Sequence, residues 1–446
     1  NPGTVALYPY VIIGHRGRYL CKTRNPTDRA SGLWKGSFSE KRSEKKEVLI
    51  MIIAPKIKGF LCTTAHPGGC AADVNAQIKQ VERGGAIANV PQRVLVIGAS
   101  GGYGLATRIA SAFGGKAETI GLFFERPAQK GRTASPGWYK SAAFTEAAHA
   151  RGLYAKNFNG DAFSQSMKDA VIDCIEKDWG QVDLVVYSLA APGRPLPSGA
   201  TVRSTLVPIG EPFSGATIDF NSRELRSIAL EPASDDEIAA TVKVMGGEDW
   251  EDWMQQLLNR GCLAEGALTT NYTYLGSEVT WPIYYHGTIG RAKEDLDRAA
   301  AALATILSPV NGRADVVVMK GLLTQAASAI PGMSVYLSLL FKAMKAAGTH
   351  EGCLEQVERL FRSQLFSENQ RRDDAGRIRM DDWELAPEIQ AMVKANWGKV
   401  SQENLDSLTD FEGYRAAFLN LHGFDIPGVD YELEQDPEVE MSLEPI

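Results

Sequence analysis

Short apolar runs alternate with amphipathic segments along most of the chain from Gln92 onward. Apolar runs bounded by turn residues are typical of buried strands, whereas apolar residues three and four positions apart are typical of helices. The expected strands are Val94–Gly98, Thr119–Glu125, Leu153–Asp161, Val182–Ala190, Thr270–Gly276 and Asp315–Met319. Strands that alternate with helices in this way predict an α/β fold with a doubly wound parallel sheet.

The segments between these strands have helical periodicity. Directly after the first strand, Leu105, Ile109 and Phe113 share one face of an expected helix. Further helices are expected at 142–152, at about 167–179 and at 292–307. Each of them joins two consecutive strands, as the crossover connections of a parallel sheet require.

Two segments interrupt this alternation. Turn-rich sequence from Pro192 to about Gly266 includes the amphipathic run Asp236–Arg260, and the chain is mainly helical after about Met333. We expect both to pack on the sheet, the first (192–266) as a helical insertion that covers the substrate and the second as C-terminal helices. Neither is expected to form an independent domain.

The first fifty residues differ from the rest in composition. Residues 1–50 contain ten Lys or Arg and four acidic residues, a net charge of +6, whereas the whole 446-residue chain carries −7. Because they show no sustained helix or strand period, we expect a basic extension at 1–50 and a single domain at 51–446. The extension is either a loosely ordered leader or a weak transit-like segment. The expected location is cytoplasmic, or organellar in the second case.

Charge and cysteine content exclude several classes of function. With a pI of about 5.6 the whole chain offers no footprint for nucleic acid, and no apolar run reaches the roughly 18–20 residues of a membrane span. The six cysteines are scattered without a CxxC pair, as in reduced cytosolic proteins. Cys62, His66 and Cys70 are regularly spaced, but we expect Pro67–Gly69 to break a helix there, so no metal site is expected.

The stretch VLVIGASGGYGLATR places a glycine-rich turn between an expected strand and an expected helix. Such a turn can hold a dinucleotide or a triphosphate, or it can be a flexible loop. A triphosphate site needs Lys followed by Ser or Thr after the glycines, and Tyr103-Gly104-Leu105 stands there instead. The spacing Gly98-x-x-x-Gly102-x-Gly104 is associated with short-chain dehydrogenase/reductase folds.

Glu125 ends the second expected strand, about twenty residues beyond the turn, where an acid can bind the adenosine ribose hydroxyls. A carboxylate there repels the extra phosphate of NADPH and favours NADH, although the adjacent Arg126 softens that preference. The alternative is an ordinary surface acid. Asp161 and Leu189-Ala190 also end expected strands, and ligands of doubly wound sheets bind at those ends.

Tyr284 and Lys293 are candidates for the catalytic chemistry. No tyrosine of the chain has a lysine four residues later, the spacing that short-chain carbonyl reductases need. Nine residues on a regular helix span about 900°, which places two side chains on opposite faces. We therefore predict that Tyr284 lies before, or in the first distorted turn of, the helix that carries Lys293. The alternative is a packing tyrosine and a solvated lysine.

From Met51 to the tail the sequence resembles the trans-2-enoyl-CoA reductases and single-chain NADH-dependent enoyl-acyl-carrier-protein reductases. The resemblance covers about nine-tenths of the chain and rests on GFLCTTAHPGGC, VLVIGASGGYGLATR, NGDAF, VDLVVYSLAAP, VMGGEDWE, YLGSEVTWPIYYHGTIGRAK, LTQAASAIP and HEGCLEQ. The Tyr-x8-Lys spacing is the signature of that family. Tyr285 departs from its pattern, which has Trp after the catalytic tyrosine.

The resemblance implies a Rossmann-type fold and a role for each matching residue. Tyr284 is implied to be the catalytic proton donor, Lys293 to bind NADH, and Tyr274 to contact the acyl substrate. The residues implied to line the cofactor are Gly98, Ala99, Ser100, Gly101, Gly102, Tyr103, Phe124, Glu125, Asp161, Ala162, Leu189, Ala190, Leu322, Leu323 and Thr324.

The expected function is NADH-dependent reduction of the trans-2 double bond of an enoyl thioester, the final step of the fatty-acid elongation cycle. The alternatives are a short-chain carbonyl reductase and an NAD-binding sensor without turnover. The substrate is expected on acyl carrier protein or on CoA, with no nucleic-acid or membrane partner, and the chain is expected to be a monomer. His286 is interpreted as a packed or hydrogen-bonded loop residue, with a proton relay as the alternative.

Overall fold

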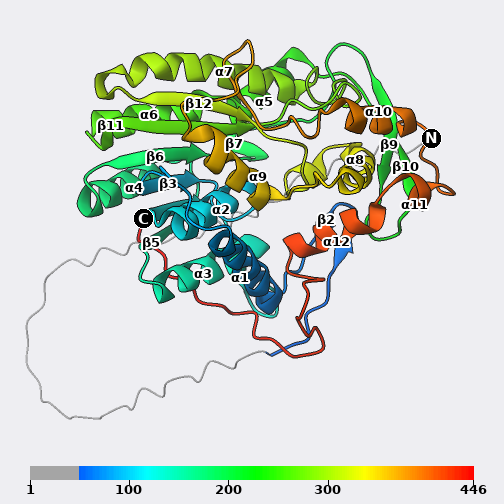
Figure 1. Ribbon diagram of the computed structural model, residues 1–446, viewed down its shortest axis with the longest axis horizontal. Helices are drawn as coiled ribbons and strands as arrows, with labels where there is room; N and C mark the ends of the chain where they lie inside the picture. Colours follow the sequence, from blue (N-terminus) through cyan, green and yellow to red (C-terminus); the bar gives the residue numbers. More distant parts are fainter. Residues whose placement is uncertain (1–49) are drawn as a thin grey trace, which may run out of the picture. The chain divides into compact units, whose positions relative to one another are not determined.

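A computed structural model describes residues 50–446. Their central feature is a sheet of seven strands in the order β13-β12-β11-β6-β3-β4-β5, in which every neighbouring pair is parallel. In Figure 1 the labelled strands β12, β11, β6, β3 and β5 follow one another from top to bottom. The strands are β3 (Arg93–Ile97), β4 (Glu118–Phe123), β5 (Ala155–Asn159), β6 (Val182–Tyr187), β11 (Leu263–Thr273), β12 (Arg313–Val318) and β13 (Ile378–Arg379).

Helices cover both faces of this sheet. Alternate residues of β3 point to opposite faces: Val94 and Val96 pack in one buried cluster, and Leu95 and Ile97 in the other. The first cluster includes residues of α1 (Pro67–Arg83), α2 (Gly102–Ile109), α3 (Pro136–Ala150) and α9 (Cys353–Leu360). The second includes residues of α4 (Gln165–Asp178), α6 (Glu248–Asn259) and α7 (Thr288–Ile306). The predicted doubly wound parallel sheet is therefore confirmed.

The strand predicted at Thr270–Gly276 differs in its bounds, because β11 begins at Leu263 and ends at Thr273. Its pairing with β6 shifts register between Leu263 and Leu268, and Gly266 there has a φ of 72°. Because the strand is irregular here, the sequence pattern does not indicate its first half. Tyr274 consequently lies just beyond the end of the strand.

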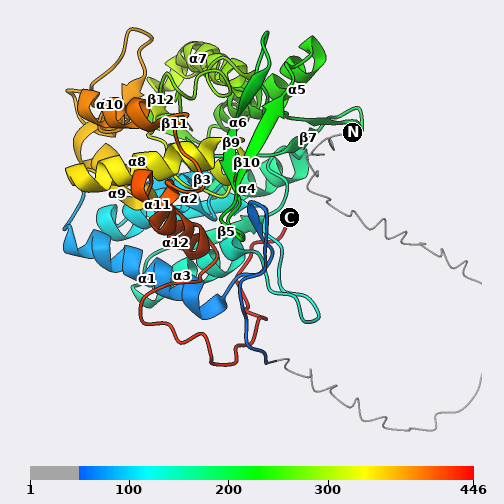
Figure 2. The ribbon, with the colours of Figure 1, turned by 90° about the vertical axis from the view of Figure 1, so that its right-hand side faces the viewer.

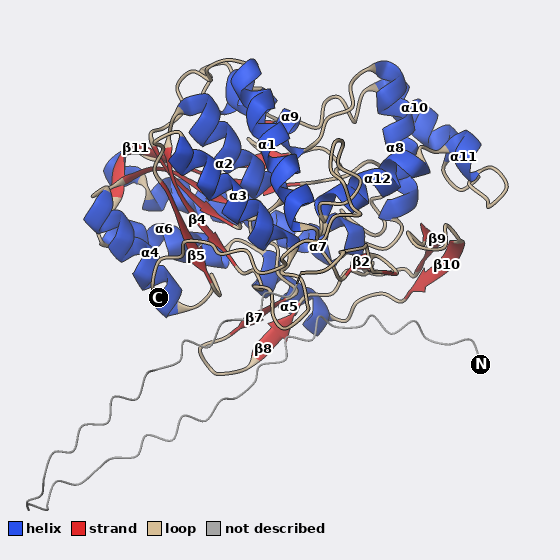
Figure 3. Ribbon diagram, turned by 90° about the horizontal axis from the view of Figure 1, so that it is seen from below, coloured by secondary structure: helices blue, strands red, loops and turns tan. Residues whose placement is uncertain are grey.

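The insertion at 192–266 is helical only in part. It contains two hairpins, β7 (Gly193–Pro195) with β8 (Thr201–Arg203) and β9 (Phe213–Ile218) with β10 (Leu225–Leu230), which Figure 3 shows apart from the central sheet. After the hairpins come α5 (Asp235–Met245) and α6.

Helix α6 packs on the sheet, as expected of the insertion. Its Trp250 and Trp253 are fully buried in the second cluster, so α6 is the crossover helix between β6 and β11. The expected single run Asp236–Arg260 is split at Gly246-Gly247, where a Cβ on Gly247 would lie 2.1 Å from the Cβ of Ala299. Close packing on α7 thus explains the break.

The C-terminal helices form a further core beside the sheet. Helix α8 (Met333–Ala347) is buried along almost its whole length between α10 (Pro387–Asn396), α12 (Phe411–Leu421) and the β9–β10 hairpin, with α11 (Leu405–Leu408) nearby. Figure 2 shows α8 next to α11, α12 and the hairpin. This confirms the predicted helical part after about Met333 and makes α8 a core helix.

The prediction that Pro67–Gly69 break a helix is wrong. They follow the hairpin β1 (Ile57–Lys58)–β2 (Leu61–Cys62) and form the first turn of α1, with His66 as the N-cap whose Nδ1 accepts from the amide of Gly69. Proline is tolerated there because the first amides of a helix have no intrahelical acceptor. Among residues 50–446 no group of His, Cys, Asp and Glu side chains could hold a metal ion, and no helix is long and apolar enough to span a membrane.

Candidate active site

The glycine-rich turn leaves the first amides of α2 open. Gly98 has a φ of 89°, and a Cβ there would lie 2.2 Å from the carbonyl oxygen of Ser188. A Cβ on Gly104 would lie 1.9 Å from the carbonyl oxygen of Gly98, whereas one on Gly101 would meet no atom within 4 Å. No side chain caps the helix at Gly101. Such an uncapped helix start, with bare backbone facing outward, fits a pyrophosphate.

Glu125 is tied to the same turn. Its Oε1 accepts a 2.7 Å hydrogen bond from Ser100 of the turn, and its Oε2 accepts one from Ser135, the N-cap of α3. A Cβ on Gly137 would lie 2.1 Å from that Oε1, so the helix start approaches the carboxylate closely. Burial raises the pKa of Glu125, and the two serine hydroxyls oppose that shift. The neighbouring Phe124 is 67% exposed, a free aromatic face beside the carboxylate.

Contacts bring the other predicted cofactor residues to the same edge of the sheet. A Cβ added to Gly98 would lie 3.1 Å from the Cα of Leu189, and a Cβ added to Gly102 would lie 3.5 Å from the Cγ2 of Thr324. Tyr103 donates to the carbonyl oxygen of Lys320, at the start of the segment that holds Leu322 and Leu323.

The end of β5 reaches this edge as well. Asn159 exchanges two hydrogen bonds with the backbone of Glu125, and Asp161-Ala162 follow that strand after Gly160. Trp253 of α6 donates to the carbonyl oxygen of Ala162, which fixes that backbone from the opposite helix layer.

Tyr284 precedes the helix that carries Lys293, as the spacing predicted. Helix α7 begins at Thr288, and Tyr284 lies in a series of turns before it. A Cβ on Gly290 would lie 1.8 Å from the carbonyl oxygen of Tyr285, so only glycine allows the chain to fold back there. His286 is exposed and packs edge-on against Trp281, as expected of a loop histidine.

The polar ends of Tyr284 and Lys293 have no partner among residues 50–446. Tyr284 is only 5% exposed, yet its hydroxyl makes no hydrogen bond within the described chain. Burial, and to a smaller degree the charge of Glu384, raises the pKa of the phenol. Burial lowers the pKa of Lys293 to about 8, and no carboxylate forms an ion pair with its ammonium within the described chain. An uncommitted phenol and an uncommitted ammonium are suited to binding a ligand.

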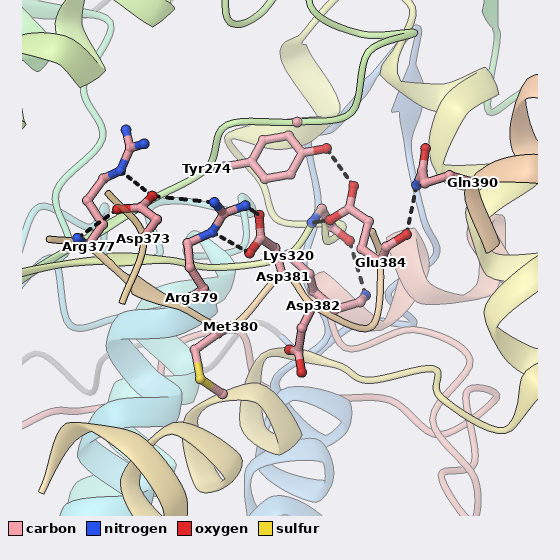
Figure 4. Close-up of polar contacts among 12 residues, drawn as sticks. Tyr274, Lys320, Asp373, Arg377, Arg379, Met380, Asp381, Asp382, Glu384 and Gln390 are labelled. Atoms are coloured by element: carbon pink, nitrogen blue, oxygen red, sulfur yellow. Dashed lines mark hydrogen bonds and ion pairs between the residues drawn. The ribbon is translucent and has the colours of Figure 1, made fainter. Parts of the chain in front are cut away.

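The structure also places Tyr274 beside Tyr284 and joins it to a residue that the sequence did not indicate. The two tyrosine rings meet edge to face with centroids 4.8 Å apart. Tyr274 donates a 2.8 Å hydrogen bond to Oε1 of Glu384, a fully buried carboxylate (Figure 4). Glu384 lies 110 positions further along the chain, with no motif around it, so only the tertiary structure reveals this contact.

Comparisons with known proteins agree with this geometry. Residues 132–366 match the catalytic region of trans-2-enoyl-CoA reductase, and residues 52–130 match the NAD(P)H-binding domain of the same enzyme. The chain belongs to the trans-2-enoyl-CoA reductase family. Within this family it is 54% identical over 394 residues to an enoyl-[acyl-carrier-protein] reductase [NADH] of Tolumonas auensis, an alignment that covers 88% of this chain and 99% of that protein.

Solved structures of trans-2-enoyl-CoA reductases share its fold. The enzyme of Clostridium acetobutylicum in complex with NADH has a TM-score of 0.86 and 42% identity, over 89% of this chain and 100% of that one. The enzyme of Treponema denticola in complex with NAD has a TM-score of 0.83 and 45% identity over the same shares.

A third match concerns a different cofactor. Residues 372–434 match an enoyl reductase FAD binding domain. In this family member the segment begins with the two-residue strand β13, and the side chains that follow are committed to protein contacts: Asp381 pairs with Arg379, and Asp382 with Arg359. No glycine-rich turn between a strand and a helix, like the one before α2, occurs within 372–434.

Proposed function

We propose that this chain reduces the trans-2 double bond of enoyl thioesters with NADH, the final step of the fatty-acid elongation cycle, and that Tyr284 is its proton donor. The observation that carries this assignment is the Tyr284 hydroxyl, which belongs to a side chain only 5% exposed and makes no hydrogen bond among residues 50–446. Tyr284 comes after β11, at the same end of the parallel strands as the glycine-rich turn and Glu125. A phenol on a side chain fixed by burial, whose hydroxyl has no protein partner, is available to donate to a ligand.

The reduction adds a hydride to the β-carbon of the enoyl thioester and a proton to the α-carbon. NADH, when bound, supplies the hydride. As the hydride arrives, negative charge develops on the thioester oxygen, and the Tyr284 hydroxyl donates a hydrogen bond to that oxygen. A donor directed at developing charge in a site that excludes water stabilises the transition state more than the ground state. The α-carbon then takes its proton from the phenol or through water.

The residues at the sheet edge fit the cofactor. The open amides before Gly104 would hold the pyrophosphate, and Glu125 would accept hydrogen bonds from the adenosine ribose hydroxyls. Lys293 would hold the nicotinamide ribose and bias the phenol electrostatically. The remaining contacts would come from Phe124, Asp161-Ala162, Leu189-Ala190 and Leu322–Thr324. The carboxylate of Glu125 disfavours a 2′-phosphate, so NADH is preferred over NADPH.

The physiological substrate is proposed to be an enoyl chain on acyl carrier protein or on CoA, with Tyr274 in contact with the acyl part. The chain is proposed to act as a cytoplasmic monomer. All five cysteines in the described part of the chain are free, as suits a reducing compartment. Size-exclusion chromatography with light scattering tests the monomer, and kinetics with both carriers rank the substrates.

One assay tests the reaction. NADH oxidation is followed by absorbance with crotonyl-CoA, and again with acetoacetyl-CoA, a keto substrate. Oxidation with crotonyl-CoA alone supports the enoyl reductase. Oxidation with the keto substrate alone indicates a carbonyl reductase, and NADH binding without oxidation of either indicates a sensor.

A further inference from the structure

Glu384 accepts hydrogen bonds from three segments that are far apart in the sequence. It lies between β13 and α10, and its side chain is fully buried. Oε1 accepts from the hydroxyls of both Tyr274 and Tyr336, and Oε2 accepts from the amide of Gly321. Figure 4 shows the carboxylate between Tyr274 and Lys320. Neither the sequence motifs nor the proposed reaction uses this residue.

Each of the three partners has a proton that it can donate to the carboxylate. An ionised carboxylate has acceptor sites alone, whereas a protonated one would have to donate to one of the partners. Burial raises the pKa of Glu384, and the bonds from Tyr336, Gly321 and Tyr274 oppose that shift together with the charge of Lys320. The three hydrogen bonds thus favour the ionised carboxylate, and burial opposes it.

This arrangement determines what Tyr274 can offer to a substrate. A phenol has a single proton, and that of Tyr274 is given to Glu384. Its oxygen retains acceptor capacity only. Tyr284, whose ring touches that of Tyr274, keeps its own proton free of any partner in the described chain. Of these two neighbouring phenols, one is a fixed acceptor and the other is an available donor.

We propose that Glu384 is a positioning residue of the reduction: it holds Tyr274 as a hydrogen-bond acceptor toward the substrate and leaves Tyr284 as the phenol that donates to the thioester oxygen. The inference rests on the proposed function, because it needs Tyr284 as the donor. An acceptor at Tyr274 would keep a second donor from drawing the thioester oxygen away from Tyr284.

A purely structural role is the competing explanation, since Glu384 also ties Tyr336 of α8 into the buried core. Gln390 donates to the backbone oxygen of Glu384 and lies within 3.4 Å of the Tyr336 hydroxyl. Tyr336 is thus a matched control for Tyr274. It donates to the same carboxylate oxygen but packs in the C-terminal helical core, with its ring against Trp397.

The test is Glu384→Gln, which keeps the shape and removes the charge. With its carbonyl oxygen toward the Gly321 amide, the new NH₂ faces the two phenols, and the proton of Tyr274 is released. We expect kcat with crotonyl-CoA to fall about tenfold to a hundredfold, the range for losing a hydrogen bond to a charged group. Because the bond to Gly321 survives, the KM for NADH should change by about twofold at most.

A double-mutant cycle separates positioning from structure. In a Tyr274→Phe background we expect Glu384→Gln to change kcat by about twofold at most, whereas in a Tyr336→Phe background its full effect should remain. An equal loss in the Tyr274→Phe and parent backgrounds overturns the proposal. If the glutamine variant does not fold, the same cycle with Glu384→Asp, an ionised acceptor of shorter reach, gives the coupling.

The parent protein distinguishes the two levels of failure. A parent that does not oxidise NADH with crotonyl-CoA overturns the proposed function and the inference with it. An active parent whose cycle is additive overturns only the role of Glu384. Asp315→Asn is the control for loss of a buried carboxylate elsewhere, because Asp315 pairs with Arg313 and Arg372 and has no contact with Tyr274.

Discussion

The rings of Tyr274 and Tyr284 meet edge to face at 4.8 Å, yet their hydroxyls have different surroundings. Tyr274 donates to Glu384, and Tyr284 has no partner within residues 50–446. The protein thus gives two neighbouring phenols different chemistry without changing the residue type. The following predictions depend on this difference and on the cofactor edge beside it.

Replacing Tyr284 by Phe should remove the donor that faces the thioester oxygen. Loss of one such donor costs about 2.7–4 kcal/mol of transition-state stabilisation, or about a hundredfold to a thousandfold in kcat. NADH oxidation with crotonyl-CoA measures the loss. Tyr285→Phe is the matched control, since Tyr285 is the adjacent, only half-buried tyrosine, and it should retain the parent rate. A fully active Tyr284→Phe would contradict the mechanism.

Replacing Glu125 by Gln should weaken the preference for NADH. Removing the carboxylate abolishes its repulsion of a 2′-phosphate, and Arg126 is adjacent, so the ratio of kcat/KM for NADH over NADPH should fall about tenfold or more. Glu118→Gln is the control, because Glu118 is an exposed carboxylate at the opposite end of β4. An unchanged ratio in Glu125→Gln would assign the selectivity to other residues.

At neutral pH, the buried charge of Lys293 should lower the free energy of unfolding of the cofactor-free protein. Its pKa is lowered from 10.5 to about 8 by burial, so between these values the unfolded state binds more protons than the folded state. Stability rises with pH wherever the unfolded state binds more protons than the folded state. The destabilisation by the buried charge of Lys293 is therefore complete below about pH 8 and decreases as the pH rises toward 10.5.

Lys293→Met tests this sign. At pH 7 the variant should melt at a higher temperature than the parent without NADH, and the difference should shrink between pH 8 and 10.5. Affinity for NADH, measured by fluorescence titration, should fall because the ammonium is lost. A variant that melts lower than the parent at pH 7 would show that Lys293 has a stabilising partner in solution.

Two glycines of the turn should differ in what they support. Gly104→Ala places a Cβ 1.9 Å from the carbonyl oxygen of Gly98, so we expect a loss of about 1–3 kcal/mol in the free energy of unfolding. Gly101→Ala meets no atom within 4 Å, so its stability should change by about 0.5 kcal/mol or less. Because the Cβ added by Gly101→Ala points to where the pyrophosphate would lie, the NADH affinity of this variant should fall. Thermal melts and titrations of both variants check this, and a stable Gly104→Ala would contradict the close approach.

The sequence could predict what depends on contiguous residues. A continuous apolar run indicated the buried strand β3, and the glycine spacing indicated the turn before α2, because both features are local in the sequence. The nine-residue spacing of Tyr284 and Lys293 required an irregular helix start. Gly290 provides it through its close approach to the carbonyl oxygen of Tyr285.

The prediction at Pro67–Gly69 was wrong because a rule for the interior of a helix was applied to residues at its start. Pro67–Gly69 look like helix breakers, but the first turn of a helix accepts them because its amides need no intrahelical acceptor. Trp250 and Trp253, by contrast, lie in an insertion interrupted by turns that was expected to pack on the sheet, as structural or lid residues. Their burial against the sheet is decided by packing on α4 and α7, and that packing leaves no trace in the local pattern.

The sequence by itself therefore determined the sheet, the cofactor-binding turn and the candidate phenol Tyr284, since each depends on residues close together in the chain. Only the tertiary structure decided which phenol keeps its proton. Glu384, Tyr336 and Gly321 reach Tyr274 from separate segments, and hydrogen bonds between such segments have no spacing rule along the chain. They form because burial leaves each donor no other acceptor than the one carboxylate beside it.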